Sequence, residues 1–298
     1  MHQRLEGGRE LTVGPKQGTD EHPLITIITS TFNAANDLHW TIDSIRAQTY
    51  PNIQWIVVDG GSRDNTVYIL KANEDIIDYW FSEPDNGIYD AWNKALEYSK
   101  GEWIQFLGAG DELAYSETMS RVSRYLSNAF PRYELVYGTI DIISEERRQL
   151  LEHIGKPWNE MKNRWQGIRP ALPVHPEVFH HRCIFSDLDF KQYKVVGDSF
   201  IMLKSIQRKN PLFIDLLIDR MPHGGTSTKP ENVYLIYREM KKINQLLNIN
   251  PPLLNRLIFK FKVYIKYVIL RFLGYNAFIF LGDLFRFLTF KKRKWMIK

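Results

Sequence analysis

The first half of the chain alternates short apolar runs with amphipathic stretches. Four runs are rich in β-branched and aromatic residues and nearly free of polar interruptions, which is typical of strands buried on both faces. They cover residues 24–30, 53–59, 76–82 and 102–107. The stretches between them predict helices over residues 36–48, 64–72 and 87–99. This alternation indicates an α/β fold with a mostly parallel central sheet and flanking helices.

The pattern is less regular beyond residue 132. Strands are expected over residues 134–139, 173–181 and 212–218, and helices over 198–206 and 231–247. The Trp- and Arg-rich stretch between residues 158 and 169 fits neither period, and Asn250-Pro251-Pro252 then interrupts the chain. We therefore expect an α/β domain over residues 23–228, a connecting helix within 229–250 and a separate tail over 251–298.

The tail is amphipathic and strongly basic. On a helical wheel, one uncharged arc of about 120° carries only apolar side chains. These residues are Leu254, Leu257, Ile258, Phe261, Ile265, Val268 and Phe272. The tail holds eleven Lys and Arg against one acid, Asp283, whereas the first 250 residues hold 28 Lys and Arg against 33 Asp and Glu. The pattern predicts a helix that lies in a membrane interface, with basic side chains reaching lipid phosphates.

Two alternatives compete with an anionic membrane surface as the partner of residues 251–298. The tail could pack on the body as an ordinary C-terminal helix. Nucleic acid is a weaker alternative, because basic arms that bind it are usually polar, and we expect no nucleic-acid partner. The longest uncharged stretch of the tail, residues 272–282, has 11 residues, against about 20 needed to cross a bilayer. A second basic cluster follows at residues 291–294.

Composition narrows the class of protein further. The 298 residues are 44% hydrophobic and 24% charged, which is ordinary for a folded soluble protein. Residues 1–22 have no apolar centre, so they are expected to be a disordered leader and not a secretion signal. Cys183 is the one cysteine, which excludes an internal disulfide and favours a reducing compartment such as the cytoplasm.

Acidic residues follow three of the predicted parallel strands. Asp59 closes the second strand, Asp85 follows the third and Asp111 follows the fourth. Ligands of open parallel sheets bind beyond the carboxyl ends of the strands, where such acids can hold a ribose, a base N–H or a divalent cation. The alternative is that each acid caps a helix or a turn. A P-loop is excluded, because the chain has no Gly-x4-Gly-Lys-Ser/Thr.

Histidines gather around the predicted strand over residues 173–181. His175, His180, His181 and Cys183 do not have a familiar zinc spacing, and strand alternation would direct His180 and His181 to opposite faces. We therefore do not expect a structural metal there.

Four segments resemble a known family in their order and spacing. They are PLITIITSTFN (23–33), VVDGGSRDNT (57–66), SEPDNGIYDAWNKA (82–95) and GEWIQFLGAGD (101–111). Together they resemble the family 2 glycosyltransferases, which are inverting, nucleotide-sugar-dependent enzymes of the GT-A fold. The third segment resembles members that act in bacterial surface polysaccharide biosynthesis. The resemblance is strong over residues 23–115 and thinner to about 228.

The resemblance implies roles for individual residues. Thr31, Asn33 and Asp59 match positions that hold the base and ribose of the nucleotide. Asp85, Gly87 and Asn93 match the nucleotide-sugar block, in which Gly87 permits a close backbone approach. Asp90 either faces the donor as well or makes a local salt bridge on its helix.

The metal-binding stretch of the family departs from its usual pattern here. Gly108-Ala109-Gly110-Asp111 keeps one carboxylate where the family has an acidic cluster. A Mn²⁺ or Mg²⁺ cofactor would therefore rely on Asp111, the donor phosphates, water and one distant ligand. Arg or Lys side chains could neutralise the leaving diphosphate instead.

The resemblance also implies a catalytic base and a late loop. Asp198, in Val196-Gly197-Asp198-Ser199-Phe200, matches the base at the start of a helix, where the alternative is a plain helix cap. His175 resembles a position near the acceptor. His223, in the glycine-rich stretch 221–227, matches a loop that closes over the diphosphate, or else lies in a simple exposed loop.

The expected activity is that of an inverting, hexosyltransferase-type glycosyltransferase. It would move a sugar from a nucleotide-diphosphate donor to a hydroxyl of a lipid-linked or cell-surface glycan, and it would be cytoplasmic, lying peripherally on the inner face of the membrane. The alternative is a non-catalytic member of the same fold that binds nucleotide sugars or acts as a scaffold in a glycan-assembly complex.

Overall fold

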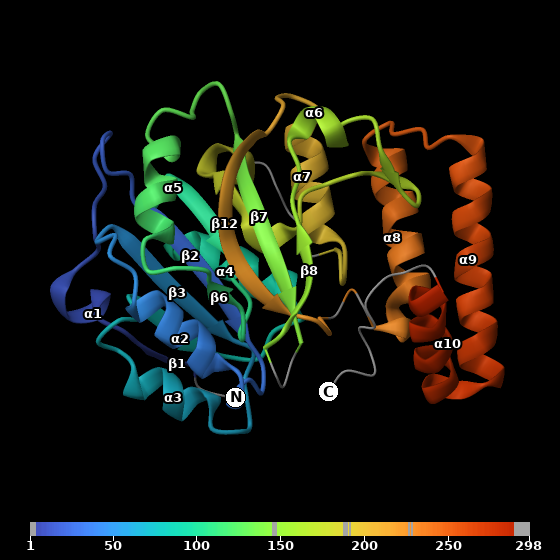
Figure 1. Ribbon diagram of the computed structural model, residues 1–298. Helices are drawn as coiled ribbons and strands as arrows, with labels where there is room; N and C mark the ends of the chain where they lie inside the picture. Colours follow the sequence, from blue (N-terminus) through green and yellow to red (C-terminus); the bar gives the residue numbers. More distant parts are fainter. Residues whose placement is uncertain are drawn as a thin grey trace.

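The computed structural model describes residues 4–144, 148–186, 190, 192–225, 227 and 229–288. A twisted sheet forms the centre, helices cover both of its faces, and three C-terminal helices stand together at one end (Figure 1). The sheet runs in the order β1-β4-β3-β2-β5-β11-β7-β12-β6, and β8 pairs with β7 beside this path.

The parallel half of the sheet confirms the predicted α/β pattern. It consists of β4 (Tyr79–Ser82), β3 (Ile53–Asp59), β2 (Ile25–Thr31) and β5 (Trp103–Phe106). β4 begins three residues later than the predicted strand 76–82, because the carboxylate of Asp78 accepts a hydrogen bond from the Trp55 N–H and contacts Lys16. All four strands are buried, which explains their continuous apolar sequences.

The second half of the sheet is mixed. β11 is antiparallel to both β5 and β7, whereas β7 and β12 are parallel to each other. The strand expected over 173–181 begins only at residue 178, because a short 3-10 turn, η1 (His175–Glu177), precedes it. The strands of this half are β6 (Glu112–Leu113), β7 (Leu135–Ile143), β8 (Leu150–Ile154), β11 (Val178–His181) and β12 (Leu212–Pro222).

The expectation of a disordered leader over residues 1–22 is wrong for its described part. β1 (Leu5–Gly7) pairs with β4, and the short helix α1 (Glu10–Val13) follows it. The guanidinium of Arg4 lies 3.9 Å from the centre of the Phe81 ring. Without β1, the edge strand β4 would leave its backbone N–H and C=O groups unpaired, and such an edge readily binds a further strand. A strand of three residues is too short to show an alternating pattern in the sequence.

Helices on the two faces enclose two hydrophobic clusters. On one face, apolar side chains of three helices pack against the sheet: α2 (Leu38–Arg46), α3 (Thr66–Ala72) and α5 (Thr118–Leu126). On the other face the helices are α4 (Ile88–Tyr98), α7 (Gly197–Ile206) and α8 (Val233–Leu246). Met240 and Ile243 of α8 are buried in this second cluster. The segment 229–250 is therefore part of the core as well as a connection.

The irregular Trp- and Arg-rich stretch forms short elements beside α7. They are α6 (Trp158–Met161) and a two-stranded sheet of β9 (Trp165–Gln166) and β10 (Arg169–Pro170). Two-residue strands leave no periodic trace in a sequence, which is why this stretch resisted prediction.

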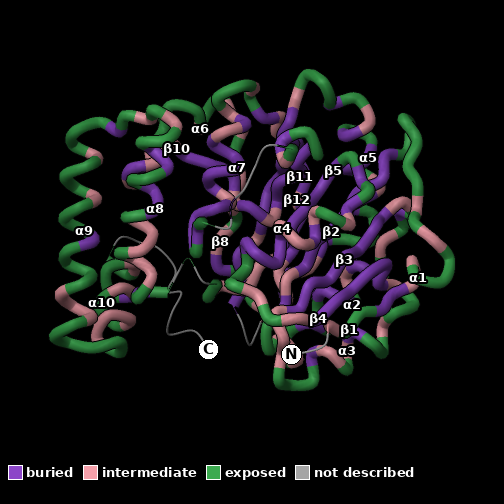
Figure 2. Tube along the Cα trace, turned by 180° about the vertical axis from the view of Figure 1, so that it is seen from behind, coloured by how far each residue is buried: buried purple, intermediate pink, exposed green. Residues whose placement is uncertain are grey.

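The tail forms two helices, α9 (Leu253–Phe272) and α10 (Gly274–Leu288), which contact each other, and α9 also contacts α8. Most of their surface is exposed (Figure 2). Among the described residues, no helix has both the length and the apolar character needed to cross a membrane. The predicted basic cluster at 291–294 lies outside the described residues.

Candidate active site

A cleft of about 490 Å³ opens beyond the carboxyl ends of β2 and β5. Asn33, Asp111, His175, Asp198 and His223 all line it. These residues come from separate parts of the chain, and the sequence alone indicated each of them. The fold therefore brings one acid from the parallel half of the sheet and one from α7 into the same space.

Asp198 lies in the first turn of α7 and is half-buried. The Tyr89 hydroxyl donates a hydrogen bond to its Oδ1 at 3.2 Å. Burial raises the pKa of Asp198 above the ordinary aspartate value, while Arg169 and the Tyr89 hydroxyl act against that rise. A carboxylate with a raised pKa that lines a cleft has the properties of a general base.

The backbone that leads into Asp198 is fixed by a buried glutamate of α8. The carboxylate of Glu239 accepts hydrogen bonds from the N–H groups of Lys194, Val195 and Val196 at 2.7, 3.0 and 3.1 Å. A carboxylate that accepts three backbone bonds holds the segment strongly. Glu239 therefore positions the start of α7, and no sequence motif indicates this role.

Asp111 forms a compact turn with the glycines before it. Its Oδ2 accepts a hydrogen bond from the Gly108 N–H at 2.9 Å, and a Cβ on Gly108 would approach that oxygen to 2.7 Å. Burial raises the pKa of Asp111 to about 6. Asp37 lines the cleft beside Gly110, and its side chain makes no capping bond to α2.

Two cations line the same cleft, and neither was singled out from the sequence. Arg148 contacts Glu112 and donates to the Gly110 carbonyl at 3.3 Å. Lys194 donates to the Asn86 carbonyl at 2.8 Å. Only the fold reveals them, because their sequence neighbours carry no motif. Together they bring positive charge to the cleft, which suits an anionic ligand.

The nucleotide residues expected from the parallel strands lie beside the cleft. Thr31, Asp85 and Gly87 line an adjoining cavity of about 410 Å³, which shares Phe32 and Ile88 with the cleft. Asp85 Oδ1 accepts a hydrogen bond from the Gly87 N–H at 2.8 Å. Gly87 has φ of 113°, a conformation that side chains disfavour.

Asp59 differs from its expected role as a nucleotide ligand. Its carboxylate is fully buried (0% exposed) and accepts hydrogen bonds from Thr31, Ser62 and Ser82 side chains and from backbone N–H groups. In this structure Asp59 therefore shapes the loop after β3 and does not face the cleft. Asn33 also contacts the loop after β3, because its side-chain oxygen accepts a hydrogen bond from the Arg63 N–H.

Asp90 and Asn93 also point away from the expected position. Asp90 is buried on α4, accepts from the Asn86 N–H and lies 3.5 Å from Lys94, which matches the local salt bridge that we considered. Asn93 donates to the Tyr89 carbonyl within its own helix and lines a different cavity. Their position on α4 turns both side chains from the cleft.

His175 lies in a stack of aromatic rings at the cleft wall. Its ring lies 4.9 Å from Trp92 and 5.2 Å from Phe106. Burial lowers its pKa to about 3, so His175 stays neutral at physiological pH. His180 contacts the Phe106 ring, whereas His181 stacks on Phe130, so the two lie on opposite faces as strand alternation predicts.

The glycine-rich loop that holds His223 reaches the cleft. His223, Gly224 and Gly225 line it, and the His223 N–H donates to the Ile143 carbonyl at 2.9 Å. The loop begins where β12 ends.

A divalent cation would have few protein ligands here. Within the described ranges, no group of three or more His, Cys, Asp or Glu side chains could hold a metal ion. The donor chemistry nevertheless fits an oxygen-seeking cation, because the carboxylates of Asp111 and Asp37 both line the cleft.

A family model connects these residues with known proteins. The model described as "Glycosyl transferase family 2" matches residues 26–190, which is more than half of the chain. That range holds the parallel strands and most of the cleft, but it ends before Asp198 and α8.

Individual relatives and solved structures show the same likeness. A "PGL/p-HBAD biosynthesis glycosyltransferase" of Mycobacterium bovis is 35% identical over 183 residues, which are 59% of this chain and 67% of the relative. S. aureus TarS 1-349, solved with UDP, matches 90% of this chain and 78% of its own with a TM-score of 0.57 and 15% identity. The mannosyltransferase PcManGT from Pyrobaculum calidifontis, solved with GDP-Man and Mn²⁺, matches 82% of this chain and 70% of its own with a TM-score of 0.52 and 17% identity.

The two structures share the fold with this chain, at identities too low to show more. The chain spans 44% of the length of an uncharacterized glycosyltransferase of Mycobacterium tuberculosis and 40% of one of Rickettsia typhi. The expected GT-A fold is confirmed.

Proposed function

This chain belongs to glycosyl transferase family 2, and from that premise we propose that it is an inverting glycosyltransferase with a nucleotide-sugar donor. Its acceptor is a hydroxyl of a lipid-linked or cell-surface glycan. The observation that carries the proposal is the cleft that gathers Asp198, Asp111 and Asn33 from separate elements. The retained carboxylates favour an enzyme over the non-catalytic scaffold that we also considered.

The proposed reaction is a single displacement with Asp198 as the base. Its carboxylate takes the proton of the acceptor hydroxyl while the oxygen of that hydroxyl attacks the anomeric carbon of the donor. The bond from that carbon to the diphosphate breaks on the opposite side, which inverts the configuration. The Tyr89 hydroxyl and Arg169 hold the carboxylate in place and keep it ionised.

The leaving diphosphate requires positive charge. Arg148 and Lys194 line the cleft and supply it, and the loop with His223 covers the same region. Asp111, with Asp37 beside Gly110, would hold a Mn²⁺ or Mg²⁺ ion, which would neutralise diphosphate oxygens when bound. PcManGT was solved with such an ion.

The nucleotide lies in the adjoining cavity in this proposal. Thr31, Asp85 and Gly87 line that cavity, and Asn33 lines the cleft that adjoins it. Asp59 contributes indirectly, because its hydrogen bonds fix the loop after β3. UDP in the TarS structure supports a nucleotide ligand for this fold.

We also propose peripheral attachment to the cytoplasmic face of the membrane through residues 251–298. The apolar arc predicted for α9 stays uncovered, with exposed fractions of 67% at Leu254, 63% at Phe261 and 77% at Phe272. An apolar surface beside basic side chains is typical of a helix that lies in a membrane interface. This attachment would present the cleft to a lipid-linked acceptor.

The test is sugar transfer from labelled UDP- and GDP-sugars to polyprenyl-diphosphate-linked saccharides in vesicles. Proton NMR then gives the anomeric configuration of the product. The proposal predicts transfer with inversion by the native protein and none by Asp198→Asn. Transfer with retention, or equal transfer by both proteins, would refute it.

A further inference from the structure

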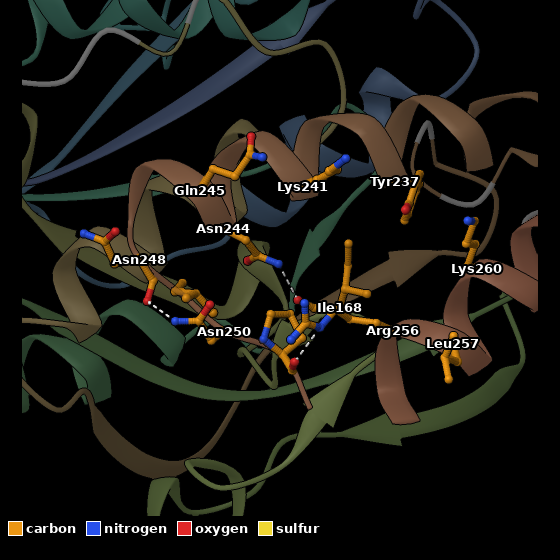
Figure 3. Close-up of a pocket in the computed structure, with 12 residues that line it drawn as sticks. Ile168, Tyr237, Lys241, Asn244, Gln245, Asn248, Asn250, Arg256, Leu257 and Lys260 are labelled. Atoms are coloured by element: carbon orange, nitrogen blue, oxygen red, sulfur yellow. Dashed lines mark hydrogen bonds between the residues drawn. The ribbon is translucent and has the colours of Figure 1, made fainter. Parts of the chain in front are cut away.

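A groove of about 310 Å³ lies between α8 and α9, apart from the catalytic cleft. Figure 3 shows side chains of both helices around it, with the turn that joins them at one end. The groove and the cleft have no lining residue in common. The proposed transfer reaction does not use the groove. We therefore consider separately which ligand its lining residues could bind.

The charged lining of the groove is wholly basic. Lys241 of α8 and Arg256 and Lys260 of α9 line it, and its lining includes no acidic side chain. The Nε of Arg256 donates to the Pro251 carbonyl at 2.9 Å, which fixes the guanidinium at the start of α9. The remaining N–H groups of that guanidinium can pair with an anion, and a planar guanidinium suits phosphate oxygens.

Amide side chains make up much of the remaining polar lining. Gln245, Asn248 and Asn250 are exposed in the groove, while Asn244 is buried and donates to the Ile168 carbonyl at 2.7 Å. A primary amide both donates and accepts hydrogen bonds, as a hydroxyl does. The groove therefore combines groups for an anion with groups for hydroxyls.

The groove also borders the exposed apolar arc of α9. Leu257 belongs to both, because it lines the groove and is 58% exposed. Leu253 and Leu254 are exposed just before it in the first turn of α9. A ligand with a polar head in the groove could extend an apolar part along this surface.

We propose that the groove between α8 and α9 is a second binding site, for a phosphate ester of a hydroxylated alcohol such as a glycerol phosphate or a sugar phosphate. Lys241, Arg256 and Lys260 bind the phosphate, and the amides bind the hydroxyls. A membrane lipid headgroup and a free phosphate ester share this chemistry. The site does not depend on catalysis in the cleft.

The test compares two single variants of the full-length protein, Lys260→Gln and Lys262→Gln. Both lysines are exposed on α9 and both changes remove one charge, but only Lys260 lines the groove. Binding of sn-glycerol 1-phosphate is measured by calorimetry. Binding to phosphatidylcholine vesicles, with and without phosphatidylglycerol, is measured by co-sedimentation. Nucleotide binding is measured on the same variants as a control for the cleft.

The proposal predicts that Lys260→Gln weakens binding of sn-glycerol 1-phosphate about fivefold, as loss of one partly exposed ion pair would, and that Lys262→Gln leaves this binding unchanged. The combined change Lys241→Gln and Lys260→Gln should weaken it by more than about tenfold. Nucleotide binding should not change. A free ester that binds identifies a soluble ligand, whereas binding to phosphatidylglycerol vesicles that Lys260→Gln weakens more than Lys262→Gln does identifies a lipid headgroup. Equal loss in both single variants, or no binding of any probe, would overturn the site.

Discussion

Asp198 is the residue on which the proposed chemistry depends. It is half-buried at the start of α7, yet it lines the cleft. The change Asp198→Asn keeps the shape of the side chain and removes its basicity. We expect the rate of transfer to fall by about 10²–10⁴-fold, the usual contribution of a general base, while nucleotide binding stays the same. Steady-state kinetics and calorimetry measure the two effects, and a variant with native turnover would exclude Asp198 as the base.

Tyr89 controls the pH at which Asp198 is ionised. A hydroxyl that donates to a carboxylate favours the charged form, so its loss raises the pKa of the carboxylate. Activity requires ionised Asp198, so kcat/KM falls on the acid side of a pKa that burial has already raised. In Tyr89→Phe we expect this acid limb to move to higher pH. The pH profile of kcat/KM measures the limb, and a shift to lower pH would contradict the account.

Several residues indicated by the sequence line the cleft, and others that line it were missed for a physical reason. Asp111 was indicated because it follows a predicted strand, and Asp198 because it resembles the position of the base in the family. Arg148 and Lys194 lie in the cleft through tertiary packing alone, and nothing local distinguishes them from surface cations. Asp59 lies at a strand end as expected, but its carboxylate accepts hydrogen bonds from Ser62 and Ser82 and so stabilises the loop after β3.

The helix α8 fixes the backbone that precedes Asp198. Glu239 is buried, and its carboxylate accepts three backbone hydrogen bonds from residues 194–196. In Glu239→Ala these buried N–H groups lose their partner, so we expect the free energy of unfolding to fall by about 2–4 kcal/mol. We also expect kcat to fall because Asp198 is less well positioned.

Urea denaturation measures the change for Glu239→Ala. The matched control is Arg238→Ala, at the exposed neighbouring position on the same helix, which should change the stability by less than about 0.5 kcal/mol. Equal effects of the two substitutions would show that the hydrogen bonds of Glu239 do not hold the segment.

The helix α9 tests the membrane proposal. Phe261 is 63% exposed within the apolar arc, and Tyr68 of α3 is 74% exposed on the body. Burial of a large apolar side chain contributes about 1.5–3 kcal/mol. We therefore expect Phe261→Glu to weaken binding to anionic vesicles by about tenfold or more, and Tyr68→Glu to leave it unchanged. Co-sedimentation measures both, and equal binding of the two variants would remove the case for α9 as the anchor.

Elements with a strong local pattern were predicted well, and elements made by pairing were not. The strand 53–59 has the predicted bounds because its apolar run is buried on both faces. β1 has only three residues, and its position depends on the free edge of β4. The tail helix was expected from its amphipathic pattern, but the contact of α9 with α8, which creates the groove, depends on tertiary packing.

At the scale of the molecule, the parallel strands explain why the donor residues meet. The carboxyl ends of β2, β3, β4 and β5 lie on one side of the sheet, so residues 31–33, 85–87 and 108–111 come together there. The second half of the sheet and α7 then bring His223 and Asp198 to the same cleft. The groove lies between α8 and α9 and the apolar arc lies on α9, and these C-terminal helices stand at one end of the molecule (Figure 1).

The most direct test of the account is nucleotide binding by the purified full-length protein. Thermal unfolding is followed with a panel of nucleoside diphosphates and nucleotide sugars, with and without Mn²⁺. The account predicts that one nucleotide class stabilises the protein, by about 2.7 kcal/mol when the ligand is present at about 100 times its Kd. A folded protein that no member of the panel stabilises would contradict the assignment of the cleft as a nucleotide-sugar site.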